Sequence, residues 1–240
     1  MRNSLRYPAC RPGSVIATAT AGAVLLLCAG AAAAQVGGNI ALLSDYRFRG
    51  VSMSDGHPVP QLTLNYDDPD SWYWGVQASG ASLHERGGTQ LIAYAGMARR
   101  LASGWSWEAG ASRSVLTRDH GSDYGEWYAG LAAERIGVRL YFAPHYFGRD
   151  MRTLYAEING LHPLQHGFKL VAHIGVLRPL SHPGMESASM RRDGSIGLAA
   201  ALGDWNAQLA WVASSGGAPR SVYYVEAASR AVVLSAAYSF

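Results

Sequence analysis

The chain has 240 residues, with 20 Lys and Arg against 17 Asp and Glu, and its two cysteines are Cys10 and Cys28. Three of the basic residues and both cysteines fall within residues 1–34, so residues 35–240 carry 17 basic and 17 acidic side chains. Without a basic surplus to neutralise phosphates, nucleic acid is not an expected partner. Disulfides, thiol nucleophiles and Cys-ligated metals are excluded from residues 35–240.

Residues 1–34 have the three parts of a secretory signal peptide. A basic start is followed by an apolar stretch over 15–30 and by four alanines that end at Ala34. This order predicts export and cleavage after Ala34, which leaves one domain at 35–240. A retained transmembrane helix is the alternative, and it is disfavoured because the stretch is mostly Ala, Thr and Gly. A lipoprotein at Cys28 is disfavoured by the bulky residue before it. The basic residues of the start are Arg2, Arg6 and Arg11.

After residue 34 the chain divides into short segments in which apolar and polar residues alternate, with turn residues between them. Side chains alternate sides along a strand, so each segment is predicted to be a β-strand with one apolar face. An example is the apolar face of Val138, Leu140 and Phe142, opposite Arg139 and Tyr141. The twelve predicted strands are 39–49, 59–67, 72–83, 89–101, 104–116, 124–135, 137–147, 152–162, 167–177, 191–202, 205–213 and 229–240. The phase of strand 89–101 is ambiguous, and the segment 214–228 could contain additional strand.

The polar faces of these strands indicate what surrounds the sheet. They are mostly Gly, Ala, Ser and Gln rather than the Lys, Glu and Asp of a solvated sheet, and Lys169 is the single lysine. No apolar run after residue 34 is long enough for a transmembrane helix, whereas alternating segments of about ten residues are typical of membrane barrels. Because open sheet edges are forbidden in lipid, the sheet must close. The predicted fold class is all-β: a transmembrane antiparallel up-and-down β-barrel of about twelve strands.

The lengths of the connections support this topology. If Gln35 starts in the periplasm, the odd-numbered connections are extracellular and should be long, while the even-numbered ones should be short. Every even connection between the predicted strands has four residues or fewer, and four of the six odd ones have seven or more. Five tryptophans lie near the predicted periplasmic turns, where an aromatic belt belongs: Trp72, Trp74, Trp105, Trp107 and Trp205.

The segment 38–52 contains Ser-Asp-Tyr-Arg-Phe-Arg-Gly at 44–50, and Asp55-Gly56 and Pro60-Gln61 follow it. This opening resembles that of the TorF-type porins, a proteobacterial family, and later segments near 128–131 and 154–168 are also similar to family segments. The resemblance spans most of 35–240 and implies an outer-membrane barrel. It differs at Val-Ser-Met-Ser after Gly50, which lacks an expected Gln.

Charged residues are predicted to line the lumen of such a barrel. Asp45, Arg47 and Arg49 share one strand face, opposite Tyr46 and Phe48. If the two aromatics face lipid, the three charges face the lumen, because a charge on the lipid side would cost roughly 2–4 kcal/mol at the midplane. These charges form either a constriction that selects solutes or ion pairs that fill a narrow barrel. The other lumen candidates are Glu108, Glu126, Glu134, Arg139, Glu157 and Lys169.

The sequence contains no pattern that predicts an enzyme. The eight histidines show no zinc-ligand spacing, although Asp119, His120 and Asp123 could gather a cation in one loop. Ser181 and His182 are adjacent, and neighbours in sequence point apart, so they do not suggest a catalytic pair. A G-x-S-x-G elbow is absent in a strand-to-helix setting. We therefore expect no catalytic residues, no cofactor and no metal site.

The final strand alternates and ends on an aromatic residue, whereas the termini of soluble proteins usually fray. This ending resembles the last strand of bacterial outer-membrane barrels, and the resemblance implies that Tyr238 and Phe240 form a signal read by the outer-membrane assembly machinery. The last strand of an ordinary soluble sheet is the alternative.

The expected function is a narrow outer-membrane channel through which small hydrophilic solutes diffuse. Twelve strands lie between eight-stranded barrels that side chains fill and sixteen-stranded porins with open channels. The alternative is a barrel without transport, acting as a scaffold, a surface receptor or an envelope-integrity protein. The expected partners are outer-membrane lipid, the assembly machinery and small solutes.

Overall fold

The computed structural model of the chain describes residues 35–83, 86–180, 190–216 and 228–240. These residues form a closed antiparallel barrel of twelve strands and a separate two-stranded hairpin, which confirms the predicted fold class. No helix in the described ranges is both long and apolar enough to cross a membrane. The barrel strands are β1 (Gln35–Leu43), β4 (Val59–Asp67), β5 (Trp72–Leu83), β6 (Arg86–Arg100), β7 (Ser106–Leu116), β8 (Tyr124–Ala132), β9 (Ile136–Ala143), β10 (Thr153–Pro163), β11 (Phe168–Pro179), β12 (Arg191–Leu202), β13 (Trp205–Ser215) and β14 (Ala228–Ser239). The hairpin consists of β2 (Arg47–Phe48) and β3 (Val51–Ser52), and three 3-10 turns are η1 (His120–Ser122), η2 (Tyr146–Gly148) and η3 (Gln165–Gly167).

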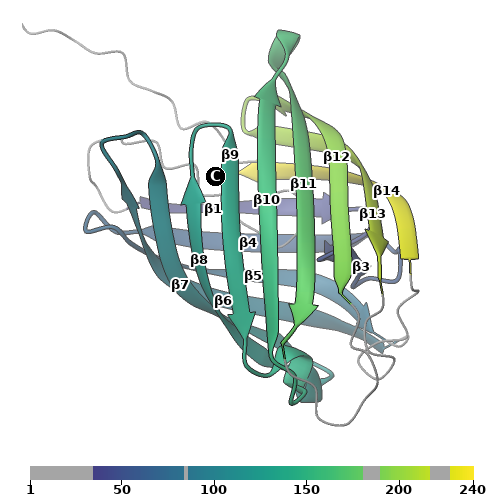
Figure 1. Cartoon of the computed structure of the whole chain (residues 1–240). Helices are drawn as coiled ribbons and strands as arrows, with labels where there is room; N and C mark the ends of the chain where they lie inside the picture. Colours follow the sequence, from purple (N-terminus) through teal and green to yellow (C-terminus); the bar gives the residue numbers. More distant parts are fainter. Residues whose placement is uncertain (1–34, 84–85, 181–189, 217–227) are drawn as a thin grey trace, which may run out of the picture.

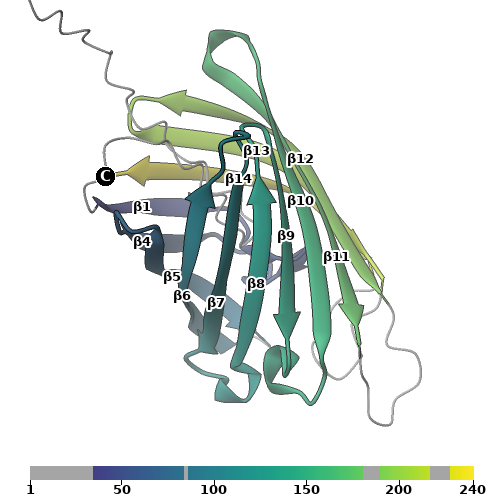
Figure 2. The same cartoon turned by 60° about the vertical axis from the view of Figure 1, so that its left-hand side comes forward.

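The barrel closes where its first and last strands pair (Figure 1). Asn39 lies opposite Ser239, and the pairing continues to Leu43 opposite Ser235. Just beyond β14, Phe240 exchanges two backbone hydrogen bonds of 3.0 Å with Gly38. Figures 1 and 2 show that β8–β12 form one wall, whose strands cross the direction of β1, β4 and β5 on the opposite wall. Closure pairs every barrel strand on both sides, so no sheet edge remains open.

Alternating burial separates an apolar outer face from a polar inner face. On β9, Val138, Leu140 and Phe142 are 38%, 47% and 36% exposed, whereas Tyr141 between them is buried. The same alternation places Leu154, Ala156 and Ile158 outward on β10 and turns Glu157 inward, as predicted. The inner face is therefore the polar one, the reverse of a soluble sheet.

The inward tyrosines pack over glycines of the neighbouring strands. A Cβ added at Gly96 on β6 would lie 2.7 Å from the Tyr73 hydroxyl of β5, and one at Gly75 would lie 2.5 Å from the Tyr94 hydroxyl. A side chain at either position would therefore collide with a ring, which explains glycine inside these strands. Residues Gln90, Ile92 and Tyr94 face inward, which resolves the ambiguous phase of the predicted strand 89–101.

The connections at the two ends of the barrel differ in length. At one end, here called the short-turn end, they have two to five residues. At the other, the long-loop end, they have seven to fifteen, except for the two-residue connection 84–85. The short-turn connection 101–105 has five residues, one more than the predicted limit. At the short-turn end Trp72, Trp74, Trp105, Trp205 and Phe240 are 41–59% exposed.

The main error in the predicted strands is at the start of the barrel. β1 begins at Gln35 and ends at Leu43, so the predicted strand 39–49 is wrong beyond residue 43. The possible extra strand within 214–228 falls largely on 217–227, outside the described residues. Within the described part, β13 extends to Ser215 and β14 begins at Ala228.

Candidate functional site in the barrel interior

Residues 44–58, which we call L1, leave the sheet after β1 and fold into the barrel instead of extending away from it. Tyr46, Phe48 and Met53 are 1%, 4% and 0% exposed. Asp45, Arg47 and Arg49 are also buried. The prediction that Tyr46 and Phe48 face lipid is therefore wrong, because the chain has left the barrel wall at this point.

Two tight turns give L1 its shape. Arg49 and Gly50 both have positive φ, at 50° and 76°, and they join β2 to β3. Asp55 and Gly56 form a second turn of this kind, with φ of 51° and 72°, closed by a 2.9 Å hydrogen bond from the His57 amide to the Ser54 carbonyl. Two consecutive positive-φ residues are the mark of the hairpin turn that favours Asn-Gly and Asp-Gly.

L1 is attached to several walls of the barrel. The Tyr46 hydroxyl donates to Gln90 of β6 at 2.8 Å, and the Ser82 amide of β5 donates to the Met53 carbonyl at 2.6 Å. On the other side, Arg47 donates to the Ser229 hydroxyl of β14 at 2.9 Å. Since β14 and β6 lie on opposite sides of β1, L1 spans the lumen between them.

Arg49 joins L1 to the barrel wall through a two-bond ion pair. Its guanidinium donates to both oxygens of Glu126 on β8, at 2.8 and 2.7 Å, and lies 4.3 Å from the ring centroid of Tyr155 and 5.0 Å from that of Tyr141. Burial alone would lower the pKa of Arg49, but the facing Glu126 carboxylate raises that pKa well above its ordinary value. Arg49 therefore stays charged inside the barrel.

An aromatic cluster packs L1 against the connection between β9 and β10. The ring of Phe48 meets Phe147 edge to face at 6.2 Å, and Phe147 lies 4.7 Å from Tyr124 and 4.6 Å from Tyr146. These four rings are buried. The cluster therefore holds the tip of L1 at the long-loop end by burial of apolar surface.

Polar side chains form a hydrogen-bonded chain around the inner wall. From β12 it begins with Asp193, which is 2.8 Å from His173, and His173 is 2.8 Å from Asn159. Asn159 donates to Glu157, which in turn accepts from Tyr141. The chain continues through Arg139, Glu108, Tyr73 and Tyr128. Burying so many polar groups together is tolerable because each satisfies the next.

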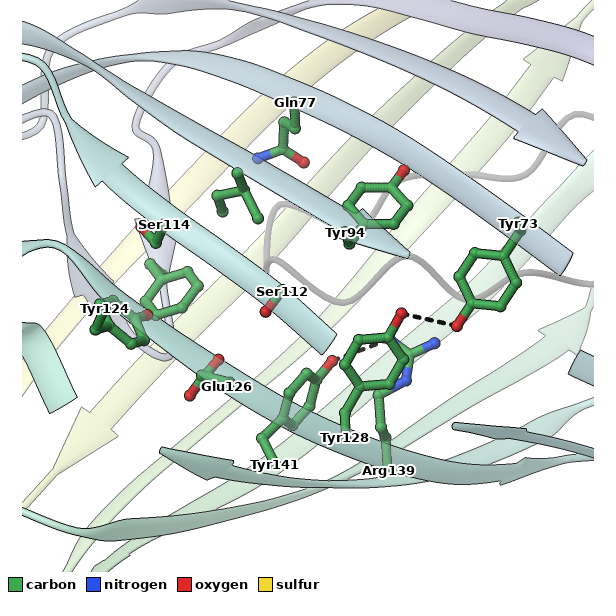
Figure 3. A pocket seen from close by; sticks show the side chains of 12 residues that line it. Tyr73, Gln77, Tyr94, Ser112, Ser114, Tyr124, Glu126, Tyr128, Arg139 and Tyr141 are labelled. Carbon is green, nitrogen blue, oxygen red and sulfur yellow. Dashed lines mark hydrogen bonds between the residues drawn. The ribbon is translucent and has the colours of Figure 1, made fainter. Parts of the chain in front are cut away.

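A cavity of about 70 Å³ lies between L1 and this wall. Its lining runs from Phe48 on L1 to Tyr73 near the short-turn end, and it includes Glu126, Arg139 and Tyr141. Figure 3 shows the Tyr73 and Tyr128 hydroxyls facing each other, with Arg139 beside Tyr128. The cavity is therefore large enough to hold water.

Among the described residues, Arg191 at the start of β12 is a buried cation whose hydrogen bonding is incomplete. Its Nη2 donates to the Ser214 hydroxyl at 3.0 Å. Within the described residues its Nε and Nη1 have no hydrogen-bond partner. Asp193, two residues along the same face, bonds to His173 and Tyr155 instead.

Most of the predicted lumen residues lie inside the barrel. Glu126 and Glu157 are buried, and Glu108 pairs with Arg139 at 2.5 Å. Lys169 is on the inner face of β11 but near the short-turn end, away from L1. The lumen prediction is wrong for Glu134, which is exposed in the connection 133–135 because β8 ends at Ala132.

The sequence analysis missed several interior residues. Arg191 and Asp193 were not singled out, although both fall on the polar face of a strand whose bounds were predicted correctly. The inward tyrosines Tyr73, Tyr128 and Tyr155 were missed because a tyrosine in a strand suits either face. Within the described ranges, no three His, Cys, Asp or Glu residues are arranged to hold a metal ion; Asp119, His120 and Asp123 form hydrogen bonds among themselves and with their own loop.

Comparisons with known proteins agree with this architecture. The structure described as "KdgM porin" is similar, with a TM-score of 0.53 at 11% identity, covering 87% of this chain and 99% of that chain. "KdgM porin in complex with disordered oligogalacturonate" has a TM-score of 0.49 at 11% identity, with the same coverage. "Bacterial polysaccharide outer membrane secretin" has a TM-score of 0.42 at 10% identity, covering 85% of this chain and 97% of that chain. At such identities the first likeness shows a shared barrel fold and no more.

No curated protein matches the chain in sequence. Residues 28–238, which include nearly the whole barrel, match the family described as "Bacterial protein of unknown function (Gcw_chp)". The chain therefore belongs to this bacterial Gcw_chp family.

Proposed function

We propose that the protein is a narrow outer-membrane channel for small hydrophilic solutes, and that L1 forms its constriction. In this proposal residues 1–34 are a signal peptide cleaved after Ala34, and the long-loop end faces the outside of the cell. The observation that carries the proposal is a closed barrel with an apolar outer face and charged side chains inside, narrowed by a loop of its own.

The membrane location is supported by the outer surface. Ile40, Ile174, Ile196 and Leu234 are 54%, 65%, 50% and 56% exposed. Exposing so much apolar side-chain area to water would be unfavourable by about 25 cal/mol per Å², whereas lipid solvates it. Closed edges and the aromatic girdle at the short-turn end are also features of outer-membrane barrels. The TorF-type resemblance of residues 44–50 is consistent with this location.

The constriction is supported by the charges that L1 brings into the lumen. Arg47 pairs with Asp45 at 2.5 Å, and Arg49 pairs with Glu126 at 2.7 Å. Charged side chains that line a narrow part of a pore select permeating ions and solutes. Glu108, Arg139 and Glu157 would line the next part of the path. L1 lies across the lumen beside the cavity, so in this proposal L1 shifts when a solute passes.

A barrel without transport remains the second candidate, because L1 is attached on several sides. Its contacts with β5, β6, β8 and β14 would suit a permanent plug as well as a gate. Such a protein would act as a scaffold, a surface receptor or an envelope-integrity component.

Single-channel recording of the purified protein in a planar bilayer distinguishes the two. For a channel we expect discrete, reproducible conductance steps, and reversal potentials in a KCl gradient that change when Arg47 and Arg49 are both replaced by Gln. A protein that is folded and heat-modifiable but electrically silent would rule out the channel and favour the second candidate. Recovery of the protein from the inner-membrane or soluble fraction would contradict the membrane location itself.

A further inference from the structure

The outer face of β10–β14 is apolar along nearly its whole length. On these strands the described outward residues with a formal charge are Arg178, Arg192 and Arg230, and all three are exposed. Each stands at the long-loop end of its strand, on β11, β12 and β14. Within the same described residues no Asp or Glu faces outward.

The strand register places these three arginines in one row. Arg192 lies opposite Val176, one outward position before Arg178 on β11. On the other side, β13 lies between β12 and β14. Arg230 of β14 is opposite Ala213 of β13. Ala213 is in turn opposite Gly194, the next outward residue of β12 after Arg192. Arg178 and Arg192 are diagonal neighbours on paired strands, about 7–8 Å apart. Arg230 is two strands from Arg192, or roughly 10 Å across the sheet, and one outward position further along. The three long side chains therefore follow one line around the long-loop end.

Directly toward the short-turn end from this row the surface becomes apolar. Ile174, Ile196, Trp211 and Val232 are 65%, 50%, 48% and 64% exposed. If these residues meet hydrocarbon, the arginines stand at the depth of the polar headgroups of the outer leaflet. Long basic side chains place their charge at that level and keep their stems along the apolar surface.

We propose that Arg178, Arg192 and Arg230 bind the phosphate groups of lipopolysaccharide in the outer leaflet. The inference rests on the proposed membrane location but does not require that the barrel conducts. A guanidinium presents a planar fork of donors that matches phosphate oxygens, so arginine suits this partner better than lysine. No Asp or Glu faces outward among the described residues of these strands, so the three positive charges together attract a lipid that carries more than one phosphate.

The test compares the full chain, expressed with its own N-terminus and purified from the outer-membrane fraction in detergent, with a triple variant R178Q/R192Q/R230Q. The matched control is R99Q/R100Q/R135Q, which removes three arginines at the short-turn end. A second variant, R178K/R192K/R230K, keeps the positive charges but lacks the planar guanidinium groups. The added probes are purified lipopolysaccharide, the same lipid after enzymatic removal of its phosphates, and inorganic phosphate. The readout is the midpoint temperature of heat-modifiability.

Intact lipopolysaccharide is expected to raise the midpoint of the wild type and of the control alike. The triple Gln variant should need about 100-fold more lipid for the same shift, since each basic residue near a charged lipid surface contributes a factor of about five. The Lys variant should fall between them. Equal shifts in the wild type and the Gln variant would overturn the proposal, and so would equal stabilisation by the dephosphorylated lipid or by inorganic phosphate. A protein absent from the outer membrane would overturn the proposed location first, which separates the two failures.

Discussion

At the scale of single residues, the barrel interior contains ion pairs that are buried and shielded from bulk water. Arg49 and Glu126 are 4% and 6% exposed and are joined by two hydrogen bonds. Removing one partner of such a pair leaves the other charge buried and unpaired, which costs more than the pair itself contributes.

Replacing Arg49 by Gln is therefore expected to destabilise the barrel by about 3–5 kcal/mol, because Glu126 is left without its partner. The double variant R49Q/E126Q should recover most of that loss. Urea unfolding of the refolded protein followed by tryptophan fluorescence measures both values. Arg113→Gln, an exposed outward arginine on β7, serves as the control and should change stability by less than about 0.5 kcal/mol. Losses that simply add in the double variant would contradict the pairing.

Arg191 leads to the opposite expectation. Its Nε and Nη1 lack hydrogen-bond partners among the described residues. Desolvation of this guanidinium therefore raises the free energy of the folded state. Arg191→Gln should increase stability by roughly 1–3 kcal/mol, the cost of leaving a buried donor unsatisfied. The same urea titration measures this change. The control is Arg192→Gln, which replaces the exposed arginine next to Arg191. A loss of stability in Arg191→Gln would mean that a group outside the described residues satisfies these donors.

At the scale of elements, L1 and the wall are joined closely enough for a reversible cross-link. Gly50, in the turn between β2 and β3, lies against Ser214 on the inner face of β13, and a Cβ built at Gly50 would be 2.7 Å from the Ser214 Cβ. A disulfide needs about 3.5–4.5 Å between its Cβ atoms, so a small shift of this turn would accommodate one. The native cysteines are confined to Cys10 and Cys28, so a new pair has no competitor in the barrel.

In the variant G50C/S214C, oxidation should hold L1 in the lumen and lower the single-channel conductance, and a reducing agent should restore it in the same bilayer. The single variant G50C, which cannot form the bond, should not respond to the reducing agent. Equal conductance of the oxidised and reduced protein would show that solutes pass without movement of L1.

At the scale of the whole molecule, the barrel depends on the seam between its first and last strands. Phe240 closes this seam through its backbone bonds to Gly38, and its ring is 59% exposed on the outer face. The backbone bonds survive a side-chain substitution, so loss of the ring removes only its packing over Gly38.

If the assembly machinery reads this aromatic end, as the resemblance of the last strand implies, Phe240→Ala should lower the amount of protein in the outer-membrane fraction several-fold and change in vitro refolding much less. Quantitative blotting of fractionated cells measures this. Leu42→Ala removes an apolar side chain of similar exposure, 58%, from the same seam and should assemble normally. An equal loss in both variants would mean that the aromatic end is not a separate signal.

The prediction from sequence succeeded wherever a local pattern decides the outcome. β4, β5 and β12 have the predicted bounds, because an alternating strand must turn its apolar side chains to one face and its polar ones to the other. The lumen positions of Glu126, Arg139 and Glu157 follow from the same alternation. At Asp45, Arg47 and Arg49 alternation continues past the end of the strand, so the pattern could not show that the chain had left the wall.

The sequence by itself therefore determined the barrel, its closure, its direction of burial and its unequal ends, since all of these depend on a period of two and on the spacing of turns. Only the tertiary structure decided that L1 folds inward and that Arg49 meets Glu126, 77 residues away. It also decided that Arg178, Arg192 and Arg230 share one row. These are relations between distant segments, set by strand register and by the space left inside the closed wall, which no local pattern contains.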